Sequence, residues 1–191
     1  MGCAYFRSMD EKPDDITGLS RKDVRLIRRS WKLIQNKSLL IPTGAELFVR
    51  LFSAYPEMMD YFQTFNLRES PAETNQKLSE HALTFMNGIN LYVTYIDDPE
   101  LWVALLHKVA ISHLERLVTT KDMERMASFF VKTLRSQLGS SFSVESERAW
   151  DRFFYFVNTI YAQVELQING IIRKRSTQTI STKTSSRTVA P

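Results

Sequence analysis

The sequence predicts an all-α fold, and three observations lead to this prediction. Apolar residues recur every three or four positions along most of the chain, which is the period of a helix with one buried face. Alternating runs rich in Val, Ile and Thr, which would predict strands, are absent. Gly and Pro are scarce, at six each in 191 residues, and 43% of the residues are hydrophobic. The length favours one domain with a core of its own.

The net charge of +4 is concentrated at one end of the chain. From Asn169 onward there are five basic residues and no acidic one, so the rest of the chain carries about −1. A body this close to neutral lacks the basic surface of a nucleic-acid-binding protein. No run approaches the roughly 18 apolar residues of a membrane span, and the start does not resemble a secretory signal. We therefore expect an intracellular protein, cytoplasmic or on the cytoplasmic face of a membrane.

The first residues, Met1-Gly2-Cys3, resemble the start of proteins that carry two acyl chains. Gly2 is the acceptor position for myristoylation, although Phe6 stands where Ser or Thr is usual. Cys3 would take the palmitoyl chain, and a second chain matters because one myristoyl group binds membranes with only ~10⁴ M⁻¹. We predict acylation of Gly2 and Cys3 within a flexible extension, residues 1–18. The alternative is an unmodified tip whose cysteine is incidental.

The first two helices are predicted from their starts and their buried stripes. Ser20 and Asp23 form a variant of the capping box, and the stripe that follows consists of Val24, Ile27, Trp31 and Ile34. A second helix is expected from Pro42 to about Ala54, with Gly44 allowing a close helix crossing. A short turn over 56–61 follows, and we expect Phe62 and Phe65 in a loop.

Four further helices are predicted over the rest of the body. Ser70-Pro71-Ala72-Glu73 predicts a helix start by its cap and its proline, and this helix should reach Ile96. Asp98-Pro99 starts the next helix, which is expected to break at 118–120. Two more are expected from Lys121 to Leu138, where Gly139 ends the helix, and from Ser143 to Asn169-Gly170. Residues 170–191 form a basic, Ser/Thr-rich tail that we expect to be disordered, and it should attract anionic lipid.

Two of the three histidines, His81 and His113, lie on separate amphipathic segments. If these helices face each other, both imidazoles point into one apolar space. Haem iron takes an imidazole nitrogen as axial ligand, so the pattern favours a haem site. The alternative is that each histidine is a half-buried surface residue. His107 lies six positions before His113 and is expected to face solvent.

An ordered set of features along the body resembles the globin family. These features are the segment 44–57, Phe62, Phe65, His81, Asp98-Pro99, Ser112-His113 with Arg116 and Val118, and Arg148-Ala149-Trp150. The separation of 32 residues between His81 and His113 is similar to that in neuroglobin and cytoglobin, and other features look like insect globins. The resemblance implies a globin fold with six helices in a three-over-three sandwich over residues 19–169. It also implies haem b as cofactor and oxygen and other diatomic gases as ligands.

The resemblance also implies roles for the residues of the site. His113 would bind iron through one ring nitrogen, while the other donates to a carbonyl near Val109 or to Ser112. His81 would either hydrogen-bond bound oxygen or bind the iron itself, and the spacing favours a bis-histidyl haem. Arg116 would either pair with a haem propionate or be solvated, and Val118 completes the proximal side. Phe62 and Phe65 would pack against the haem.

Two aromatic residues bear on the space for gas, and one of them departs from the usual globin pattern. Phe85, one turn beyond His81, stands where globins usually have a small branched residue, and Phe48 occupies a pocket position on the second helix. Two rings above the haem would narrow the space for gas. Alternatively, Phe85 packs into the core.

These features predict a haem-binding globin with a local redox, sensing or oxygen-supply role, tethered to a membrane. The alternative is a haem redox enzyme that reduces nitrite, dioxygenates nitric oxide or protects against peroxide, with an unidentified reductase. A third possibility is a globin-shaped module without haem, which the two retained histidines disfavour. The sequence indicates no catalytic base, nucleophile or second cofactor.

Overall fold

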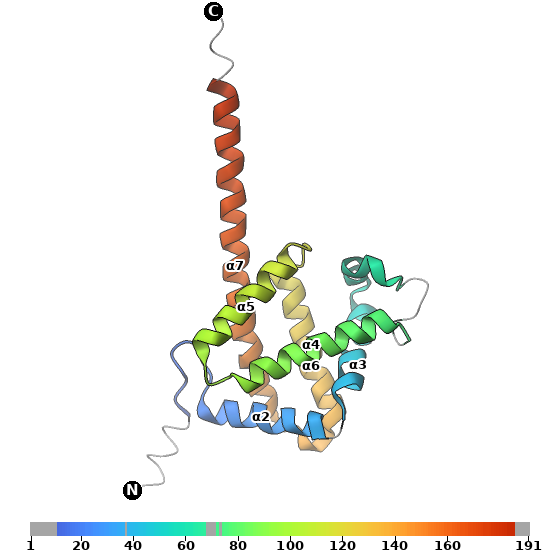
Figure 1. Ribbon diagram of the computed structural model, residues 1–191. Helices are drawn as coiled ribbons and strands as arrows, with labels where there is room; N and C mark the ends of the chain where they lie inside the picture. Colours follow the sequence, from blue (N-terminus) through green and yellow to red (C-terminus); the bar gives the residue numbers. More distant parts are fainter. Residues whose placement is uncertain (1–10, 37, 68–71, 73, 186–191) are drawn as a thin grey trace, which may run out of the picture.

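The structure is a computed structural model that describes residues 11–36, 38–67, 72 and 74–185, with side chains as far as Lys174. The described residues form six α-helices joined by short connections and two 3₁₀ helices (Figure 1). The helices are α2 (Arg21–Asn36), α3 (Leu40–Ala54), η1 (Pro56–Phe65), α4 (Gln76–Thr94), α5 (Pro99–Leu114), α6 (Thr120–Leu138), η2 (Gly139–Ser141) and α7 (Val144–Ser185). The only β pairing among them is an isolated bridge between Pro13 and Ser20. The predicted all-α fold is confirmed.

The body is built on the first half of α7, which packs against α2, α5 and α6. On the other side α3 packs against both α4 and α6. The largest fully buried side chains lie where these helices meet and are aromatic: Trp31, Trp102, Trp150, Phe130 and Phe153. Burial of such rings supplies most of the favourable free energy of a core of this kind. None of the described helices is both long enough and apolar enough to cross a membrane.

The helix caps are where local sequence decides the fold. Ser20 and Asp23 form the predicted capping box: the Asp23 amide donates to Ser20 Oγ at 3.1 Å, and the Ser20 amide donates to Asp23 Oδ2 at 3.0 Å. Asp98 caps α5 by accepting from the Leu101 amide at 3.0 Å. Gly139 ends α6 with a φ of +52°, which an L side chain rarely adopts. These three predicted boundaries are confirmed.

The predicted start of α4 is wrong. The helix begins at Gln76, because Asn75 and not Ser70 is its cap: Asn75 Oδ1 accepts from the Leu78 amide at 3.0 Å. The same buried amide donates through Nδ2 to the Phe65 carbonyl at 2.6 Å, so the cap also ties α4 to η1. Ala72 and Thr74 lie in turns. Ser70, Pro71 and Glu73 lie outside the described residues, and α4 ends at Thr94 rather than Ile96.

The two phenylalanines that were expected in a loop belong to η1. This 3₁₀ helix runs on past residue 61 to Phe65, and it is broken at Phe62, whose φ and ψ are −116° and 35°. The rings of Phe62 and Phe65 both lie edge-on to His81 of α4, with centroid distances of 5.0 and 6.1 Å. Both rings therefore face the interior between η1 and α4.

The predicted end of the last helix at Asn169-Gly170 is also wrong, because α7 continues to Ser185. Gly170 is not among the glycines with positive φ, so it does not form the left-handed cap that ends a helix. A glycine inside a helix costs only about 1 kcal/mol relative to alanine. The second half of α7 leaves the body and projects from it (Figure 1), with Ile171 and Ile172 exposed. The predicted domain boundary near 169 stays a prediction.

Gly44 makes the close helix crossing that the sequence predicts. A Cβ added at Gly44 would lie 2.9 Å from Met86 Cγ and 3.1 Å from the Ala82 carbonyl oxygen. The backbones of α3 and α4 therefore approach each other more closely than any side chain at this position would allow.

We expect Gly44→Ala to lower the free energy of unfolding by about 1–3 kcal/mol, because the extra methyl group forces α3 and α4 apart. The matched control is Gly88→Ala on α4, where a Cβ would meet nothing within 4 Å. That substitution should raise stability by about 0.4–1 kcal/mol, because alanine restricts the unfolded chain. Urea unfolding of both variants measures the difference, and equal effects at the two sites would contradict the close crossing.

Candidate functional site

A cavity of about 500 Å³ lies between α3, η1, α4, the end of α5 and the start of α6. Most of the side chains that line it are apolar, and many are aromatic. Nine of the ten predicted cofactor residues line it: Phe48, Phe62, Phe65, His81, Phe85, Ser112, His113, Arg116 and Val118. The tenth, Val109, lies behind His113. The structure thus brings together residues from four helices and a corner of the chain.

His113 lies in the last turn of α5 and is half-buried. Its Nδ1 is 2.9 Å from the Val109 carbonyl oxygen. Because a carbonyl can only accept, Nδ1 carries the proton and Nε2 keeps its lone pair. Burial lowers the pKa of His113, the hydrogen bond to Val109 opposes this shift, and the charge of Arg116 adds to the lowering. The imidazole is therefore neutral near pH 7 and has a nitrogen available to a metal.

The corner after His113 is held by backbone hydrogen bonds. The His113 carbonyl accepts from the amides of Arg116 at 2.9 Å and Val118 at 3.1 Å. Leu117, between them, has a φ of +64° and is 79% exposed, so this turn places a leucine in the left-handed region. Tyr161 Oη donates to the Val118 carbonyl at 2.7 Å and fastens the corner to α7.

His81 lies on α4 inside a group of aromatic rings. The centroids of Phe62, Phe48 and Phe65 are 5.0, 5.2 and 6.1 Å from the centroid of the imidazole, all in edge-on arrangements. Burial, and secondarily the charge of His113, lowers the pKa of His81 to about 4. Like His113, it is neutral at physiological pH. The three rings also limit how far the imidazole can swing.

Phe85 satisfies both of the alternatives considered for it. It lines the cavity, and its ring also packs edge-on against Phe48 and Phe130, with centroids 5.8 Å apart in each pair. The ring thus joins the cavity wall to the main core. Phe48 is 4% exposed and lies on α3 one turn beyond Gly44.

Arg116 is exposed at the edge of the cavity. Its guanidinium donates to the Ser112 carbonyl and to Ser112 Oγ, the latter at 3.0 Å. The side chain is therefore folded back along its own turn. His107, which was expected to face solvent, is half-buried, and it does not line the cavity.

Sequence reasoning missed an acidic residue in the wall of the cavity. Asp122 lies in the first turn of α6, where it forms a capping box with Thr119, and Tyr61 Oη donates to Asp122 Oδ2 at 2.8 Å. Burial alone would raise the pKa of Asp122, but hydrogen bonds from Thr119 and Tyr61 and the charge of Arg125 hold it below its ordinary value. Burial, with the hydrogen bond to Asp122, raises the pKa of Tyr61 to about 12. A carboxylate and a neutral phenol therefore border the apolar space.

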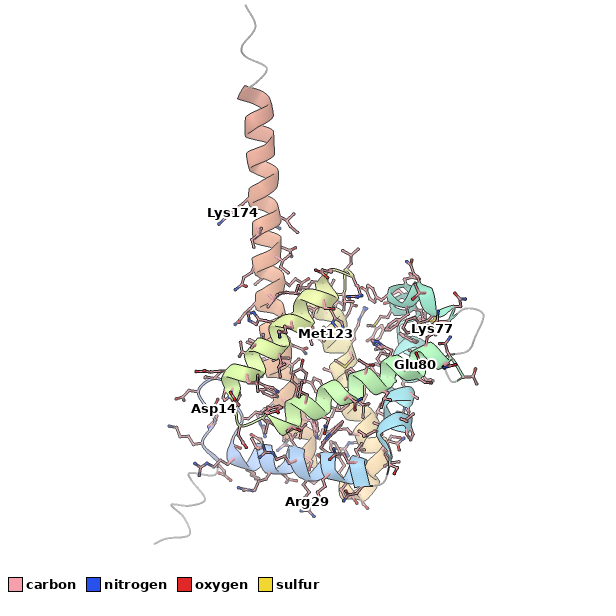
Figure 2. All side chains as sticks on the ribbon, in the orientation of Figure 1. Asp14, Arg29, Lys77, Glu80, Met123 and Lys174 are labelled. Atoms are coloured by element: carbon pink, nitrogen blue, oxygen red, sulfur yellow. The ribbon has the colours of Figure 1, made fainter. Side chains whose placement is uncertain are left out.

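The capping box was visible in the sequence as Thr119-x-x-Asp122, whereas its pairing with Tyr61 joins positions 61 residues apart. Sequence reasoning also missed several apolar lining residues, which have no local signal beyond helical periodicity. They are Leu51, Met58, Met123 and Met126, together with the polar Thr64. Figure 2 shows Met123 directed into the interior of the body.

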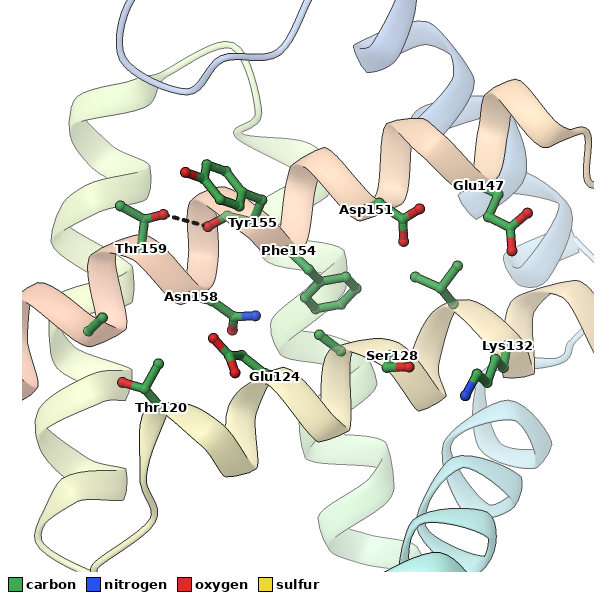
Figure 3. A pocket seen from close by; sticks show the side chains of 13 residues that line it. Thr120, Glu124, Ser128, Lys132, Glu147, Asp151, Phe154, Tyr155, Asn158 and Thr159 are labelled. Atoms are coloured by element: carbon green, nitrogen blue, oxygen red, sulfur yellow. Dashed lines mark hydrogen bonds between the residues drawn. The ribbon is translucent and has the colours of Figure 1, made fainter.

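A second hollow, of about 480 Å³, lies between α6 and α7 (Figure 3). Charged residues of both signs line it, among them Glu124, Lys132 and Asp151. Burial, and then the neighbouring Glu147, raises the pKa of Asp151. The hollow contains no imidazole or thiol, and no group of three or more His, Cys, Asp or Glu residues that could hold a metal occurs in the described residues. The cavity with the two imidazoles is therefore the candidate site.

Known proteins match the part of the chain that forms this cavity. A family model described as Globin matches residues 45–160, which include both His81 and His113. A globin of Tritia mutabilis is 28% identical over 136 residues, covering 70% of this chain and 92% of that protein. Cytoglobin-1 of Danio rerio is 25% identical over 164 residues, covering 82% of this chain and 91% of the relative.

We expect Tyr61→Phe to lower the free energy of unfolding by about 1–2 kcal/mol, because Asp122 loses a hydrogen bond to its charge. Tyr155→Phe is the matched control, because Tyr155 is 76% exposed and should tolerate the same change. Urea unfolding of each variant, compared with the unmodified chain, gives the two free energies. Equal stability of the two variants would show that the bond to Asp122 contributes nothing.

Proposed function

Because the chain belongs to the globin family, we propose that it binds haem b with both His81 and His113 as iron ligands, and that gases bind when His81 moves aside. Haem b is the cofactor of this family, and its iron binds oxygen and other diatomic gases reversibly. The single observation that supports the proposal is that two neutral imidazoles line one apolar cavity.

The residues present fit a haem. The porphyrin supplies four nitrogen ligands, so the protein has to supply only one or two. The cavity of about 500 Å³ lies in the range of pockets that take cofactors. Its aromatic walls suit a flat apolar ring, and Arg116 and Ser112 at the edge suit the carboxylates of the propionates. We propose that Arg116 turns from Ser112 toward one propionate.

We propose His113 as the permanent ligand. The Val109 carbonyl holds the proton on Nδ1, so that Nε2 is the free nitrogen, and this bond also fixes the plane of the ring. Tyr161 and the backbone bonds to the His113 carbonyl hold the turn that follows. His113 thus has one orientation and one tautomer before any cofactor arrives.

His81 is proposed as the displaceable ligand. Among the described residues, no charged or polar group holds its ring in the way that Val109 holds His113, and the rings that surround it are phenylalanine edges. These contacts keep the ring inside the cavity without fixing one rotamer. Phe48 and Phe85 restrict the space into which the ring can move, so we infer slow exchange between His81 and an external gas. Slow, internally gated binding suits a local sensing, redox or supply role better than bulk transport.

The first three residues also support a proposal about where in the cell the protein acts. We propose that acylation of Gly2 and Cys3, which lie outside the described residues, holds the globin at a membrane. Two chains are needed because one myristoyl group gives only marginal binding. Confinement to a surface would make the gas chemistry local.

We expect the dithionite-reduced, haem-loaded chain to show sharp, split visible absorption bands, which indicate low-spin iron with two axial imidazoles. His81→Leu should give one broad band, because the iron loses its second imidazole. It should also accelerate carbon monoxide binding at least about tenfold, since an internal ligand that occupies most sites lowers the competent fraction. His107→Leu, outside the cavity, is the control and should keep the split bands. A broad band in the unmodified chain would refute the bis-histidyl site but not haem binding.

We expect Gly2→Ala to move the protein from the membrane fraction to the supernatant when cells are lysed and washed in high salt, which screens electrostatic binding. Cys3→Ser should give an intermediate distribution, because a single acyl chain remains. Ser8→Ala is the control and should not change the distribution. A Gly2→Ala protein that stays in the membrane fraction to the same extent would exclude the tether.

A further inference from the structure

The outer face of α2 carries a dense set of positive charges. The helix has six basic residues, all exposed: Arg21, Lys22, Arg25, Arg28, Arg29 and Lys32. Successive residues of an α-helix are rotated by about 100°, so these six fall within an arc of about 120°. We call them the α2 basic stripe, which is about 17 Å long from the rise of 1.5 Å per residue. Figure 2 shows Arg29 on the side of α2 that faces away from the body.

The acidic residue of α2, Asp23, lies on the other side of the helix and does not neutralise the stripe. Asp23 is 4% exposed and lies on the buried side with Ile27 and Trp31. It is engaged with the Ser20 cap and with Arg152, whose Nε donates to Asp23 Oδ2 at 3.1 Å. Burial alone would raise the pKa of Asp23, but the hydrogen bonds from Arg152 and Ser20 outweigh it and lower the pKa, so this carboxylate stays ionised and inward.

Acidic groups border part of the stripe: Asp14, Asp15 and Asp97 line one hollow together with Arg21, Arg25 and Arg28. Asp97 pairs with Arg28 at 2.7 Å. Asp14 forms a local turn by accepting from the Ile16 and Thr17 amides at 3.0 and 2.8 Å. Glu145 lies near Lys22 and Arg148. These carboxylates lie beside α2 as far along as Arg28, whereas Arg29 and Lys32 lie further along the helix.

We propose that the α2 basic stripe docks the protein on an anionic lipid surface. A straight, one-sided row of lysine and arginine matches a flat layer of negative headgroups. Each basic residue strengthens binding when it lies within a Debye length of the lipid surface. A site for single-stranded or sequence-specific nucleic acid would add aromatic stacking or side chains that reach base edges. The one aromatic ring of α2, Trp31, is buried and donates to Asn90 Oδ1 at 2.8 Å.

The position of the stripe in the chain supports a lipid partner. Gly2 lies nine positions before Glu11, the first described residue, and this stretch can span at most about 32 Å. Residues 11–20 then lead into α2 at Arg21. An acyl anchor would thus hold the stripe close to the membrane, although the stripe needs no acylation to bind. The basic residues near the end of α7 lie on the opposite side of the body (Figure 1) and cannot share one flat surface with α2.

The test uses the full-length chain produced without acyl groups and co-flotation with vesicles. We expect binding to phosphatidylcholine vesicles that contain phosphatidylserine, no binding to pure phosphatidylcholine, and loss of binding at high salt. The triple variant Arg21→Gln/Arg29→Gln/Lys32→Gln should weaken binding at least about tenfold, given the strength of each basic group near anionic lipid. The matched control, Lys108→Gln/Lys121→Gln/Lys132→Gln, changes the net charge equally with exposed residues elsewhere and should retain binding.

Circular dichroism and thermal melts establish that both triple variants are folded. Equal losses in the two variants would show general charge attraction and overturn the proposal. Failure of the unmodified chain to bind anionic vesicles would overturn it too. Double-stranded DNA is the second probe: if the stripe variant loses DNA binding but keeps vesicle binding, the stripe is a nucleic-acid surface and the lipid proposal is wrong. The protein in these experiments is unacylated, and none of the measurements depends on haem. Their outcomes are therefore independent of the gas-binding and acylation tests.

Discussion

The close approach of α3 and α4 at Gly44 sets the geometry on which the cavity depends. Ala82, which lies against Gly44, directly follows His81 on α4, and Phe48 lies one turn beyond Gly44 on α3. The distance between the two backbones therefore determines how closely the Phe48 ring meets the imidazole, at a centroid separation of 5.2 Å. A side chain at position 44 would displace one wall of the cavity relative to the other. Gly44 thus controls the position of the Phe48 ring relative to the His81 imidazole.

Groups that cap helices also build the cavity. Asn75 caps α4 and at the same time donates to the Phe65 carbonyl at the end of η1, so the helix that carries His81 and the turn that carries Phe65 have a common support. Asp122 caps α6 and accepts from Tyr61, which ties η1 to α6. The two histidines differ in this respect: His113 is fixed by polar bonds, whereas His81 is confined by apolar contacts. That difference supports the proposal that His113 is the permanent ligand and His81 the displaceable one.

The sequence allowed prediction of features whose partners lie within a few residues. The Ser20–Asp23 cap, the Asp98 cap and the end of α6 at Gly139 depend on local hydrogen bonds or local φ, and the two histidines were found from helical periodicity and family resemblance. The start of α4 could not be predicted, because a tertiary bond to Phe65 selects Asn75 over a stronger local signal at Ser70-Pro71. Gly139 and Gly170 look alike in sequence, yet only Gly139 takes a positive φ. The Tyr61–Asp122 bond likewise follows from how distant segments meet.

The packed and projecting halves of α7 should respond differently to warming, although they form one continuous helix. Starting a helix is the unfavourable step, and adding residues to an existing one is nearly neutral in free energy. The part of α7 that packs against α2, α5 and α6 serves as a preformed nucleus for the residues beyond Ile168. Residues 171–174 are exposed, so their helicity depends on the helix itself rather than on packing. On warming, this segment should fray gradually from its free end, while the packed part persists until the whole body unfolds cooperatively.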